Sequence, residues 1–582
     1  MTETWNPGIP LITNQVAADI LDIEENFDYL MAMGGYWVDY SEADQGAAGS
    51  GNSVKDLVDA IGTTKKATLL FKHNAADGST TTYSFGTSET IPSNINIVVQ
   101  NGALLTLANG VVLTFSGYLQ PVPYQIFSLT GTGTPAFTDP QDLIPEMFGA
   151  VGDGSTDDST AINAAIDALE TSKGGTVKFL SKTYACNITL KQYVGLEGAS
   201  TLYRSTDAGV ASHNKTILLA NATGIIVDTP VAAAKDMSIR NIAFQGLGSG
   251  TALVGLRLRA VNKGTFENLA FDNIADQAIL LDNSDSCKFD RIFAQNCLLD
   301  TSQAAKIGVL HISATSTDNF ISNSEFTPSL AGLTDANAYI CAIVVAGAHN
   351  YFTNVIAEIA DVGVCVTGAA AVSNFFTSVR ADLNYTHGFE VVSSALNNRF
   401  VGCEAYRNSR ETTNTYNGFN VTSGNNNVFN GCAATNLSTD TTVHKYGFFD
   451  NTNSGSNRNV YVGCYSSYHD TAWFFDNDAS VGTGAQVAQH GPKPFTADDL
   501  TPSVDGYQFF TCSDYTGAKS ITDFDDGYAG QIIHLLDTSA TGYITIVNGT
   551  NIYTNTGANV NLTQNYVYSF IKYNNKWYQL GT

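Results

Sequence analysis

The chain has 582 residues and a formal net charge of −26, because 54 Asp and Glu residues outnumber 28 Lys and Arg residues. This charge argues against nucleic acid and against an anionic membrane surface as main partner, and it favours a neutral or mildly charged polymer. The nine cysteines follow no paired spacing and form no Cys/His cluster, so we expect buried thiols, no metal and no cofactor.

The first predicted element is an N-terminal helix over Asn14–Met33. Its apolar residues step by 4, 3, 4 and 3 positions: Val16, Ile20, Ile23, Phe27 and Leu30. This is the spacing of a coiled-coil seam, and it allows either self-association into a trimer or packing of the helix on its own domain. Met1-Thr-Glu-Thr-Trp lacks the basic and apolar regions of a signal peptide, and no apolar run is long enough to span a membrane. We therefore expect residues 1–35 to be an attachment and trimerisation segment of a protein made in the cytoplasm.

A small β-rich domain is predicted over residues 36–140. Ser53 begins a short capped helix that ends at Ile61, and short alternating runs follow between Ala67 and Phe127. This pattern favours a few solenoid coils behind a capping helix. The segment Thr132–Pro145 is rich in turn residues, and we expect it to be a connector.

The most specific motif begins at Pro145 and continues Glu-Met-Phe-Gly-Ala-Val-Gly-Asp-Gly-Ser-Thr-Asp-Asp-Ser-Thr-Ala-Ile-Asn-Ala-Ala-Ile. It predicts a tight turn at 152–154 and a helix Thr160–Leu169 that is capped by Asp157, Asp158 or Ser159. Such a helix would close the open end of a solenoid, which otherwise exposes unpaired strand edges.

This motif resembles the one that opens the right-handed parallel β-helix of pectate-lyase type in bacteriophage tailspikes and capsule depolymerases. The resemblance covers Pro145–Ser200 by motif and the coils to about Ser480 by architecture, with Met147 where the family usually has tryptophan. It implies that the aspartates of the motif are structural and that the protein works in the virion, attached to other tail or baseplate proteins through its N-terminus.

Residues 265–476 repeat one pattern eight times. Each copy opens with an aromatic residue in a β-prone run: Phe266, Phe289, Phe320, Phe352, Phe375, Phe400, Phe429 and Tyr461. Period-two runs such as Gly363-Val-Cys-Val fall between these aromatic residues. A repeat of this length without a helical period predicts a β-solenoid. We therefore expect an all-β, right-handed parallel β-helix over residues 141–481.

Two further series support this register. Five asparagines precede the aromatic residues by one or two positions: Asn350, Asn374, Asn398, Asn427 and Asn459. Because Asn tolerates the left-handed backbone region, they suggest the same tight turn in successive coils. Cys403, Cys432 and Cys464 each follow an aromatic residue by three positions, and we expect them to stack inside the tube.

After the coils, a Gly/Pro-rich stretch predicts a linker at 482–504, and short β runs predict a compact β module at 505–582. The module is similar to C-terminal modules of tail fibres and tailspikes, which trimerise or contact glycan. Tyr573, Trp577 and Tyr578 fit either a sugar platform or the core of a β-sandwich.

The densest set of candidate catalytic groups is Glu358, Asp382 and Glu404, one on each of three consecutive coils. Coils stack about 4.8 Å apart, so acids on neighbouring coils match the roughly 5–5.5 Å carboxyl separation of retaining glycosidases, and acids two coils apart approach the inverting range. Residues of the same coils are candidate substrate-binding groups: Arg380, Arg407, Tyr385, His387, Tyr406, Tyr468 and Trp473. The alternative is that these acids are solvated side chains paired with the arginines.

These observations lead us to expect a homotrimeric tailspike that binds a bacterial surface polysaccharide and cleaves it by hydrolysis. Two alternatives keep the fold: a spike that binds glycan without cleaving it, and a polysaccharide lyase that would use Arg380, His387 or Tyr406 as base. A secreted pectinase-like enzyme is disfavoured because no signal peptide is found.

Overall fold

The computed structural model describes residues 4–5, 9–10, 35–41, 44–49, 51–74, 78–200, 215–248, 253–298, 306–328, 340–412, 414–452, 459–469, 471–476, 486–487, 493–504, 508–527, 530–538 and 544–581. The predicted helix Asn14–Met33 lies outside these residues. The chain divides into two compact units, Met1–Leu247 with Arg259–Ala270 and Gly248–Leu258 with Phe271–Thr582. Among the described helices, none is long and apolar enough to cross a membrane.

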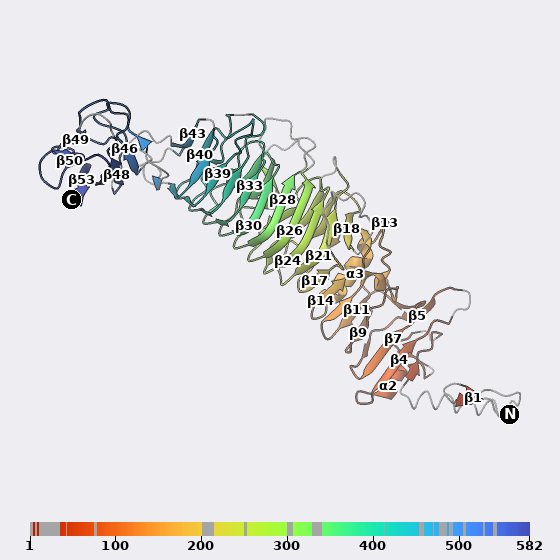
Figure 1. Cartoon of the computed structure of the whole chain (residues 1–582). Helices are drawn as coiled ribbons and strands as arrows, with labels where there is room; N and C mark the ends of the chain where they lie inside the picture. The colour runs from red at the N-terminus through yellow and green to blue at the C-terminus, as the bar shows by residue number, and fades with distance from the viewer. Residues whose placement is uncertain are drawn as a thin grey trace. The chain divides into compact units, whose positions relative to one another are not determined.

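The first unit begins with short strands (Figure 1), most of which pair in parallel. Along most of these strands, buried residues alternate with more exposed ones. Three sheets have the orders β3-β4-β7, β5-β8-β10 and β6-β9-β11. Their elements are β3 (Gly35–Trp37), α2 (Val54–Ile61), β4 (Ala67–Phe71), β5 (Thr81–Phe85), β6 (Glu89–Ile91), β7 (Ile95–Val99), β8 (Ala103–Leu107), β9 (Val112–Phe115), β10 (Phe127–Leu129) and β11 (Thr134–Phe137). Near the N-terminus, β1 (Thr4–Trp5) pairs with β2 (Ile9–Pro10). The predicted capped helix is confirmed, since the Ser53 side chain accepts a hydrogen bond from the Asp56 amide.

The prediction of a connector at Thr132–Pro145 is wrong. β11 pairs in parallel with β9, and β12 (Gln141–Leu143) pairs in parallel with β14 (Gly175–Lys178). The glycines at positions 131 and 133 indicate turns, although the residues that follow alternate in burial as in a strand, with Pro135 and Phe137 buried. The coils therefore continue through this segment.

The motif that begins at Pro145 forms the helix predicted from the sequence. It contains the 3-10 helix η1 (Pro145–Phe148), the strand β13 (Asp153–Asp157) and the helix α3 (Ser159–Glu170). The helix buries Ile162, Ile166 and Leu169. This apolar face packs against the coils, as expected of a helix that covers strand edges.

The three aspartates of the motif bind backbone amides. Asp153 accepts from the Thr156 amide at 2.7 Å and Asp157 from the Ser159 amide at 2.9 Å. Asp158 stands at the N-cap of α3 but accepts from the Val151 amide at 2.7 Å, thereby fixing the loop before the helix. The hydrogen bond from the Thr156 backbone amide holds the pKa of Asp153 well below its usual range. Their structural role is thus confirmed.

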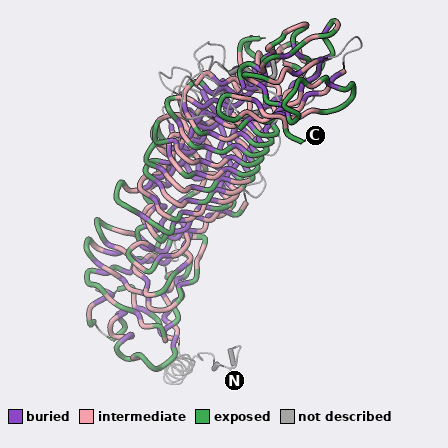
Figure 2. The backbone as a smooth tube through the Cα atoms, turned by 90° about the vertical axis from the view of Figure 1, so that its left-hand side faces the viewer, coloured by how far each residue is buried: buried purple, intermediate pink, exposed green. Residues whose placement is uncertain are grey.

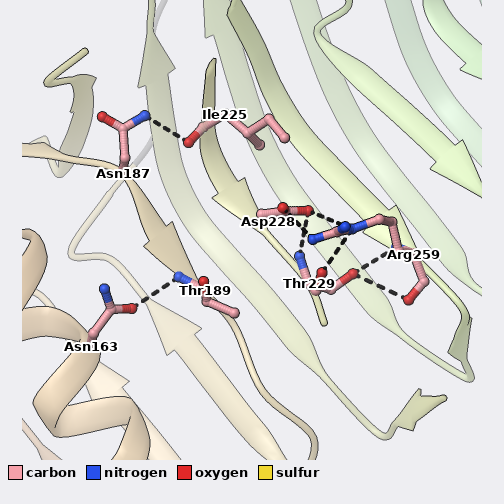
Figure 3. Close-up of polar contacts among 7 residues, drawn as sticks. All are labelled: Asn163, Asn187, Thr189, Ile225, Asp228, Thr229 and Arg259. Atoms are coloured by element: carbon pink, nitrogen blue, oxygen red, sulfur yellow. Dashed lines mark hydrogen bonds and ion pairs between the residues drawn. The ribbon is translucent and has the colours of Figure 1, made fainter. Parts of the chain in front are cut away.

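Side chains tie successive coils of the first unit together (Figure 3). Asn163 of α3 accepts from the Thr189 amide at 2.9 Å, and Asn187 donates to the Ile225 carbonyl at 2.7 Å. Arg259 binds Asp228 on the preceding coil through two hydrogen bonds of 2.6 and 3.2 Å.

The strands that follow β14 in this part of the chain are β15 (Thr183–Cys186), β16 (Ile188–Thr189), β17 (Val194–Glu197), β18 (Ile217–Ala220), β19 (Gly224–Asp228), β20 (Ala234–Lys235), β21 (Ser238–Gln245), β22 (Leu253–Arg259), β23 (Val261–Asn262) and β24 (Thr265–Asp272).

The second unit contains the predicted parallel β-helix. One sheet series follows the order β26-β28-β30-β32-β33-β35-β36-β38-β39-β41-β42-β44, and the other follows β25-β27-β29-β31-β34-β37-β40-β43. The first series is β26 (Lys288–Cys297), β28 (Phe320–Pro328), β30 (Tyr351–Glu358), β32 (Phe375–Thr377), β33 (Arg380–Asp382), β35 (Arg399–Val401), β36 (Glu404–Tyr406), β38 (Val428–Asn430), β39 (Ala433–Thr435), β41 (Val460–Val462), β42 (Tyr465–Ser467) and β44 (Gln486–Val487). The second is β25 (Ile279–Asp282), β27 (Ile307–Ile312), β29 (Ile340–Val345), β31 (Val362–Thr367), β34 (Phe389–Val392), β37 (Phe419–Val421), β40 (Tyr446–Asp450) and β43 (Ala472–Asp476). Figure 2 shows buried residues gathered along the inside of these coils.

An aromatic column fills the inside of this β-helix. Phe376, Phe400, Phe429 and Tyr461 stack with ring centroids 4.6–4.7 Å apart, and Phe352 begins the column. The predicted markers Phe320 and Phe375 are one position out of register, because Ile321 and Phe376 take the buried places. Phe320 is 43% exposed and stacks outside the tube on Tyr351. Two adjacent aromatic or apolar residues made the inside position ambiguous in the sequence.

The predicted asparagine series forms a buried ladder. The side-chain amide of Asn350 donates to Asn374 at 3.1 Å, and this bond repeats along Asn398, Asn427 and Asn459 at 2.9–3.0 Å. The left-handed backbone belongs to the residue before Asn350, Asn374, Asn398 and Asn427, namely His349, Ser373, Asn397 and Asn426. The sequence therefore located the ladder but assigned the left-handed position to the wrong residue.

The cysteine series behaves as predicted. Cys403, Cys432 and Cys464 are fully buried, and each thiol donates to a carbonyl of the preceding coil, such as Phe376 for Cys403. Burial raises the pKa of Cys432 well above its usual range. These thiols are inert packing groups.

Left-handed residues form the corners of each coil. Ser378 and Gly402 separate β32 from β33 and β35 from β36, with φ of 52° and 58°. Leu383 and Arg407 end β33 and β36 with φ of 55° and 53°. The short strands β33 and β36 therefore lie between two corners, and they form an outward face that is distinct from the one formed by β32 and β35.

The C-terminal module is a two-sheet sandwich. One sheet has the order β45-β46-β48-β52-β53-β50 and the other β47-β49-β51. The strands are β45 (Lys493–Pro494), β46 (Phe509–Thr511), β47 (Lys519–Ile521), β48 (Ile532–Leu536), β49 (Ile544–Ile546), β50 (Ile552–Tyr553), β51 (Val560–Asn561), β52 (Val567–Tyr573) and β53 (Lys576–Leu580). Trp577 is buried in the core, and its indole donates to the Phe524 carbonyl at 2.9 Å. Phe495 and Val504 pack in the same core, so residues from Lys493 onward belong to this module and not to the predicted linker at 482–504. The other predicted domain boundaries stay predictions.

Candidate active site

Three of the predicted residues share one column of the β-helix. Glu358 at the end of β30 pairs in register with Asp382 at the end of β33, and Asp382 pairs with Tyr406 at the end of β36. Because neighbouring coils lie about 4.8 Å apart, the two carboxyl groups are next to each other on the outward face. Glu404, the third predicted acid, starts β36 and pairs with Arg380 in the adjacent column.

Arg380 connects the two columns. Its guanidinium lies 3.0 Å from the Asp382 carboxylate and 3.7 Å from that of Glu404, and it covers the ring of Tyr406 at 4.3 Å. Glu404 also accepts from the Thr435 hydroxyl at 3.0 Å. The predicted grouping of arginine with acids on consecutive coils is therefore present, although Glu404 is bound by Arg380 and Thr435 instead of facing Glu358.

Burial raises the pKa of the two acids in the shared column. The pKa of Asp382 rises to about 6 because burial outweighs the opposing effect of Arg380. The Asp382 side chain is 13% exposed, and its Oδ1 is buried without a hydrogen-bond partner. The pKa of Glu358 is raised by burial and then by the nearby carboxylate of Glu325, to which it is hydrogen-bonded. Burial and the charge of Glu325 both favour the protonated form of Glu358.

Asp440 holds Arg407 at the corner after β36. Arg407 binds Asp440 through Nη2 at 2.8 Å and Nε at 3.1 Å, and these hydrogen bonds raise the pKa of Arg407. Its guanidinium lies 5.9 Å from the centre of the Tyr406 ring. Tyr406 is thus flanked by Arg380 and Arg407, which presents a rigid polar and aromatic surface next to the acids.

Tyr385 and His387 belong to the corner segment between β33 and β34. His387 accepts from the Asn417 amide at 2.9 Å and contacts Tyr416 edge to face at 5.3 Å. Burial and the nearby Lys306 lower the pKa of His387 to about 3. The imidazole is therefore neutral at physiological pH and already bonded through Nδ1. Tyr385 is partly buried, and its amide donates to the Ala360 carbonyl at 2.8 Å.

A second group of acids lies near His387 on the β31 and β34 side. Burial raises the pKa of Asp361 to about 6, and its carboxylate accepts from the Ile340 amide at 3.2 Å. Glu390 of β34 forms an ion pair with Lys306. These acids have dedicated partners, whereas Asp382 keeps one buried oxygen unpaired, so the column of Glu358 and Asp382 is the stronger catalytic candidate.

The remaining predicted residues lie farther along the coils. Tyr468 follows β42 with a φ of 52° and is 57% exposed, two coils beyond the corner at Arg407. Trp473 belongs to β43, but its side chain lies outside the described part of the structure. Sequence reasoning left Glu325 and Asp440 out of the site. Asp440 lies in the repeat between Phe429 and Tyr461.

The described residues contain no group of three His, Cys, Asp or Glu side chains arranged to hold a metal ion. The arrangement supplies a carboxyl group with a raised pKa at Glu358, the neighbouring carboxyl group of Asp382, and the guanidinium groups of Arg380 and Arg407, each paired with an acid. Chemically, this set can perform acid–base or nucleophilic catalysis on a glycosidic bond.

One family model matches the C-terminal part of the chain. Residues 498–578 match the family model of the phage depolymerase C-terminal beta sandwich domain, which confirms the resemblance to phage depolymerases for this segment. No curated protein matches the sequence.

Similar solved structures include phage proteins and a polysaccharide-modifying enzyme. A tailspike double mutant of E. coli bacteriophage HK620, solved in complex with a pentasaccharide, is 10% identical with a TM-score of 0.44, covering 67% of this chain and 77% of that one. The Azotobacter vinelandii mannuronan C-5 epimerase AlgE4 A-module is 13% identical with a TM-score of 0.42, covering 60% and 100%. ORF18 of Geobacillus virus E2 is 16% identical with a TM-score of 0.37, covering 52% and 63%.

Proposed function

We propose that the chain is a virion tailspike that binds a bacterial surface polysaccharide, such as a capsule, an exopolysaccharide or an O-antigen, and hydrolyses its glycosidic bonds. The observation that carries this proposal is the column of Glu358 and Asp382, two partly buried carboxyl groups with raised pKa on neighbouring coils. The family match of residues 498–578 supports the biological setting.

The two acids have different surroundings and therefore different roles. Glu358, whose protonated form is favoured by burial and by the charge of Glu325, acts as general acid, protonating the glycosidic oxygen as the bond to the anomeric carbon breaks. The pKa of Asp382 is about 6 despite the opposing effect of Arg380, so Asp382 is ionised at neutral pH; it attacks the anomeric carbon, or takes a proton from the attacking water. The spacing of adjacent strands favours direct attack and retention of configuration. Tyr406, Arg380 and Arg407 bind the sugar beside these acids.

Two alternatives use the same fold. In a lyase, a base would remove a proton from a uronate, but His387 is bonded through Nδ1 and Arg380 is paired with Asp382 and Glu404. In a spike without activity, the acids would only bind glycan. We further propose a homotrimer attached to tail or baseplate proteins through residues 1–35.

The test is incubation of the purified protein with capsule, exopolysaccharide and lipopolysaccharide from candidate hosts. Hydrolysis predicts a fall in polymer size, new reducing ends and no absorbance of unsaturated uronates. A fall in size with that absorbance would establish the lyase. Binding in a pull-down without any change in polymer size would establish the inactive spike.

The pH dependence of cleavage follows from Asp382. Because it acts ionised, kcat/KM should rise as pH increases through about 6, the pKa of Asp382, and fall again when Glu358 loses its proton. Arg380 favours the charged form of Asp382, so Arg380→Met should raise this pKa and move the acid limb about one pH unit or more to higher pH. An acid limb that stays in place in Arg380→Met would contradict the assignment of Asp382.

A further inference from the structure

The first unit has a pocket beside the edge strand β7. The sheet β3-β4-β7 ends at β7, and in the next coil residues 116–126 contain no strand. Gly117 lies in that coil, where an added Cβ atom would stand 3.5 Å from the Ile95 carbonyl oxygen. The missing strand and the missing side chain leave a pocket of about 490 Å³ against the paired strands β4 and β7, which Figure 1 labels near the N-terminal end.

Five polar side chains line this pocket: Lys66, Thr68, Ser93, Asn96 and Tyr118. Thr68 of β4 pairs in register with Asn96 of β7, so these two side chains project from the same face of the sheet. Within the described part of the chain, none of the five has a hydrogen-bond or ion-pair partner. Their donors and acceptors are therefore available to a ligand that replaces water.

Asn94 fixes the wall from which Lys66 projects. Its side-chain amide donates to the Gly62 carbonyl at 2.9 Å and to the Lys65 carbonyl at 2.6 Å. Its backbone carbonyl accepts from the Ala67 amide at 3.2 Å. The backbone is thus held on both sides of Lys66, and a ligand would not have to order this loop on binding.

The charge around the pocket is positive. Lys66 is exposed, and Asp and Glu are absent from the described residues that line the pocket. Two further lysines flank β4, where Lys65 covers the Tyr36 ring at 4.9 Å and Lys72 covers the Trp37 ring at 4.2 Å. A carboxylate that enters the pocket would therefore meet Lys66 without an opposing carboxylate of the wall.

Tyr118 adds an aromatic surface to the pocket. Its side chain is 60% exposed, and no ring of the described chain stacks on it. Lys178 lies near Tyr118, but its charge is paired with Asp142 at 2.8 Å. A rigid exposed tyrosine offers one apolar face and one hydroxyl group. Such a ring suits a sugar, whose C–H groups can pack on it while the amide of Asn96 and the hydroxyl of Thr68 bind its hydroxyl groups.

We propose that this pocket binds a uronate oligosaccharide, with a sugar ring packed on Tyr118 and its carboxylate at Lys66. The site goes beyond the proposed function and does not depend on it. The column of Glu358 and Asp382 belongs to the other compact unit and makes no contribution to this binding.

The experiment is isothermal titration calorimetry of the full-length protein with trimers of galacturonate and of mannuronate. At least one of them should bind with a dissociation constant at least tenfold lower than that of the neutral sugar maltotriose. Tyr118→Ala and Lys66→Ala should each raise this dissociation constant about tenfold or more, because they remove the ring and the charge. Raising NaCl from about 0.05 to 0.5 M should also weaken binding, since Lys66 is exposed.

Tyr193→Ala and Lys235→Ala are the matched controls. They remove another exposed tyrosine of the same unit, 42% exposed, and the lysine that lies 5.6 Å from the centre of its ring. Both should keep the wild-type dissociation constant. Thermal unfolding checks that every variant remains folded, and Lys66→Ala should keep the wild-type kcat for polysaccharide cleavage, so this site and the proposed function are tested separately.

Three results would overturn the assignment. The first is the absence of binding by both uronate trimers at millimolar concentration. The second is equal affinity for maltotriose or for inorganic phosphate, which would give the pocket a different ligand. The third is uronate binding that stays unchanged in folded Tyr118→Ala and Lys66→Ala, which would place the uronate elsewhere on the chain.

Discussion

Glu358→Gln and Asp382→Asn are each expected to lower kcat for polysaccharide cleavage by about 10²–10⁴-fold with little change in KM. Each substitution keeps the shape of the side chain but removes, respectively, the proton donor and the attacking carboxylate. Because Asp382 is ion-paired with Arg380 at 3.0 Å, Asp382→Asn should also release Arg380, whereas Glu358→Gln leaves that pair in place. Reducing-end release under saturating polymer measures both effects.

Asp282→Asn is the matched control for these variants. Asp282 is an exposed carboxylate at the end of β25, in the other sheet series of the same unit, and its loss should leave kcat within about twofold of wild type. Glu404→Gln separates a direct role from a positioning role. Because Glu404 is ion-paired with Arg380, Glu404→Gln should shift the acid limb of the pH profile of kcat/KM more than it lowers kcat. Full activity in both Glu358→Gln and Asp382→Asn would place the active site elsewhere.

The largest expected effect on stability belongs to Asn398→Leu in the buried ladder. Its carbonyl oxygen accepts from the Asn374 amide at 3.0 Å and side chain at 2.9 Å, and its own amide donates to Ala371 at 3.0 Å and Asn427 at 3.0 Å. Leucine supplies none of these bonds. Each buried group left without a partner costs about 1–3 kcal/mol, so we expect a loss of about 3 kcal/mol or more.

Hydrogen–deuterium exchange measures this loss locally, which suits a chain of two compact units, because such chains do not unfold in a single two-state step. The backbone amide of Asn374 should exchange about 100-fold faster or more in Asn398→Leu, because 1.4 kcal/mol corresponds to a factor of ten. Asn430→Leu is the control, since Asn430 is exposed on β38 of the next coil and should change exchange little. Equal protection in the two variants would show that the ladder adds no local stability.

Much of the fold could be predicted from local pattern. The repeat of aromatic residues located the coils, and the asparagine and cysteine series located the columns inside them, because a solenoid reproduces the same environment once per coil. The errors arose where the sequence offers two equivalent residues. At Phe375 and Phe376, only the packing of neighbouring coils decides which ring is buried.

The site could be predicted only in part. Counting positions from the aromatic residues predicted that Glu358 and Asp382 occupy equivalent positions in adjacent coils. The structure pairs these two residues in register, because each follows the aromatic residue of its own coil by nearly the same number of positions. The sequence could not show that His387, in the corner segment after Asp382, contacts Asn417 and Tyr416. It also missed Asp440, which reaches Arg407 from a segment 33 residues away.

The sequence by itself determined the parallel β-helix, the Pro145 motif with its capping helix, and the coils that carry the acids. These depend on periodicity and on local turn chemistry, which a single strand or turn already contains. The tertiary structure decided which acids share a column and that Glu325 rather than Glu404 adjoins Glu358. Those properties depend on register between strands, where a shift of one residue moves a side chain to the opposite face.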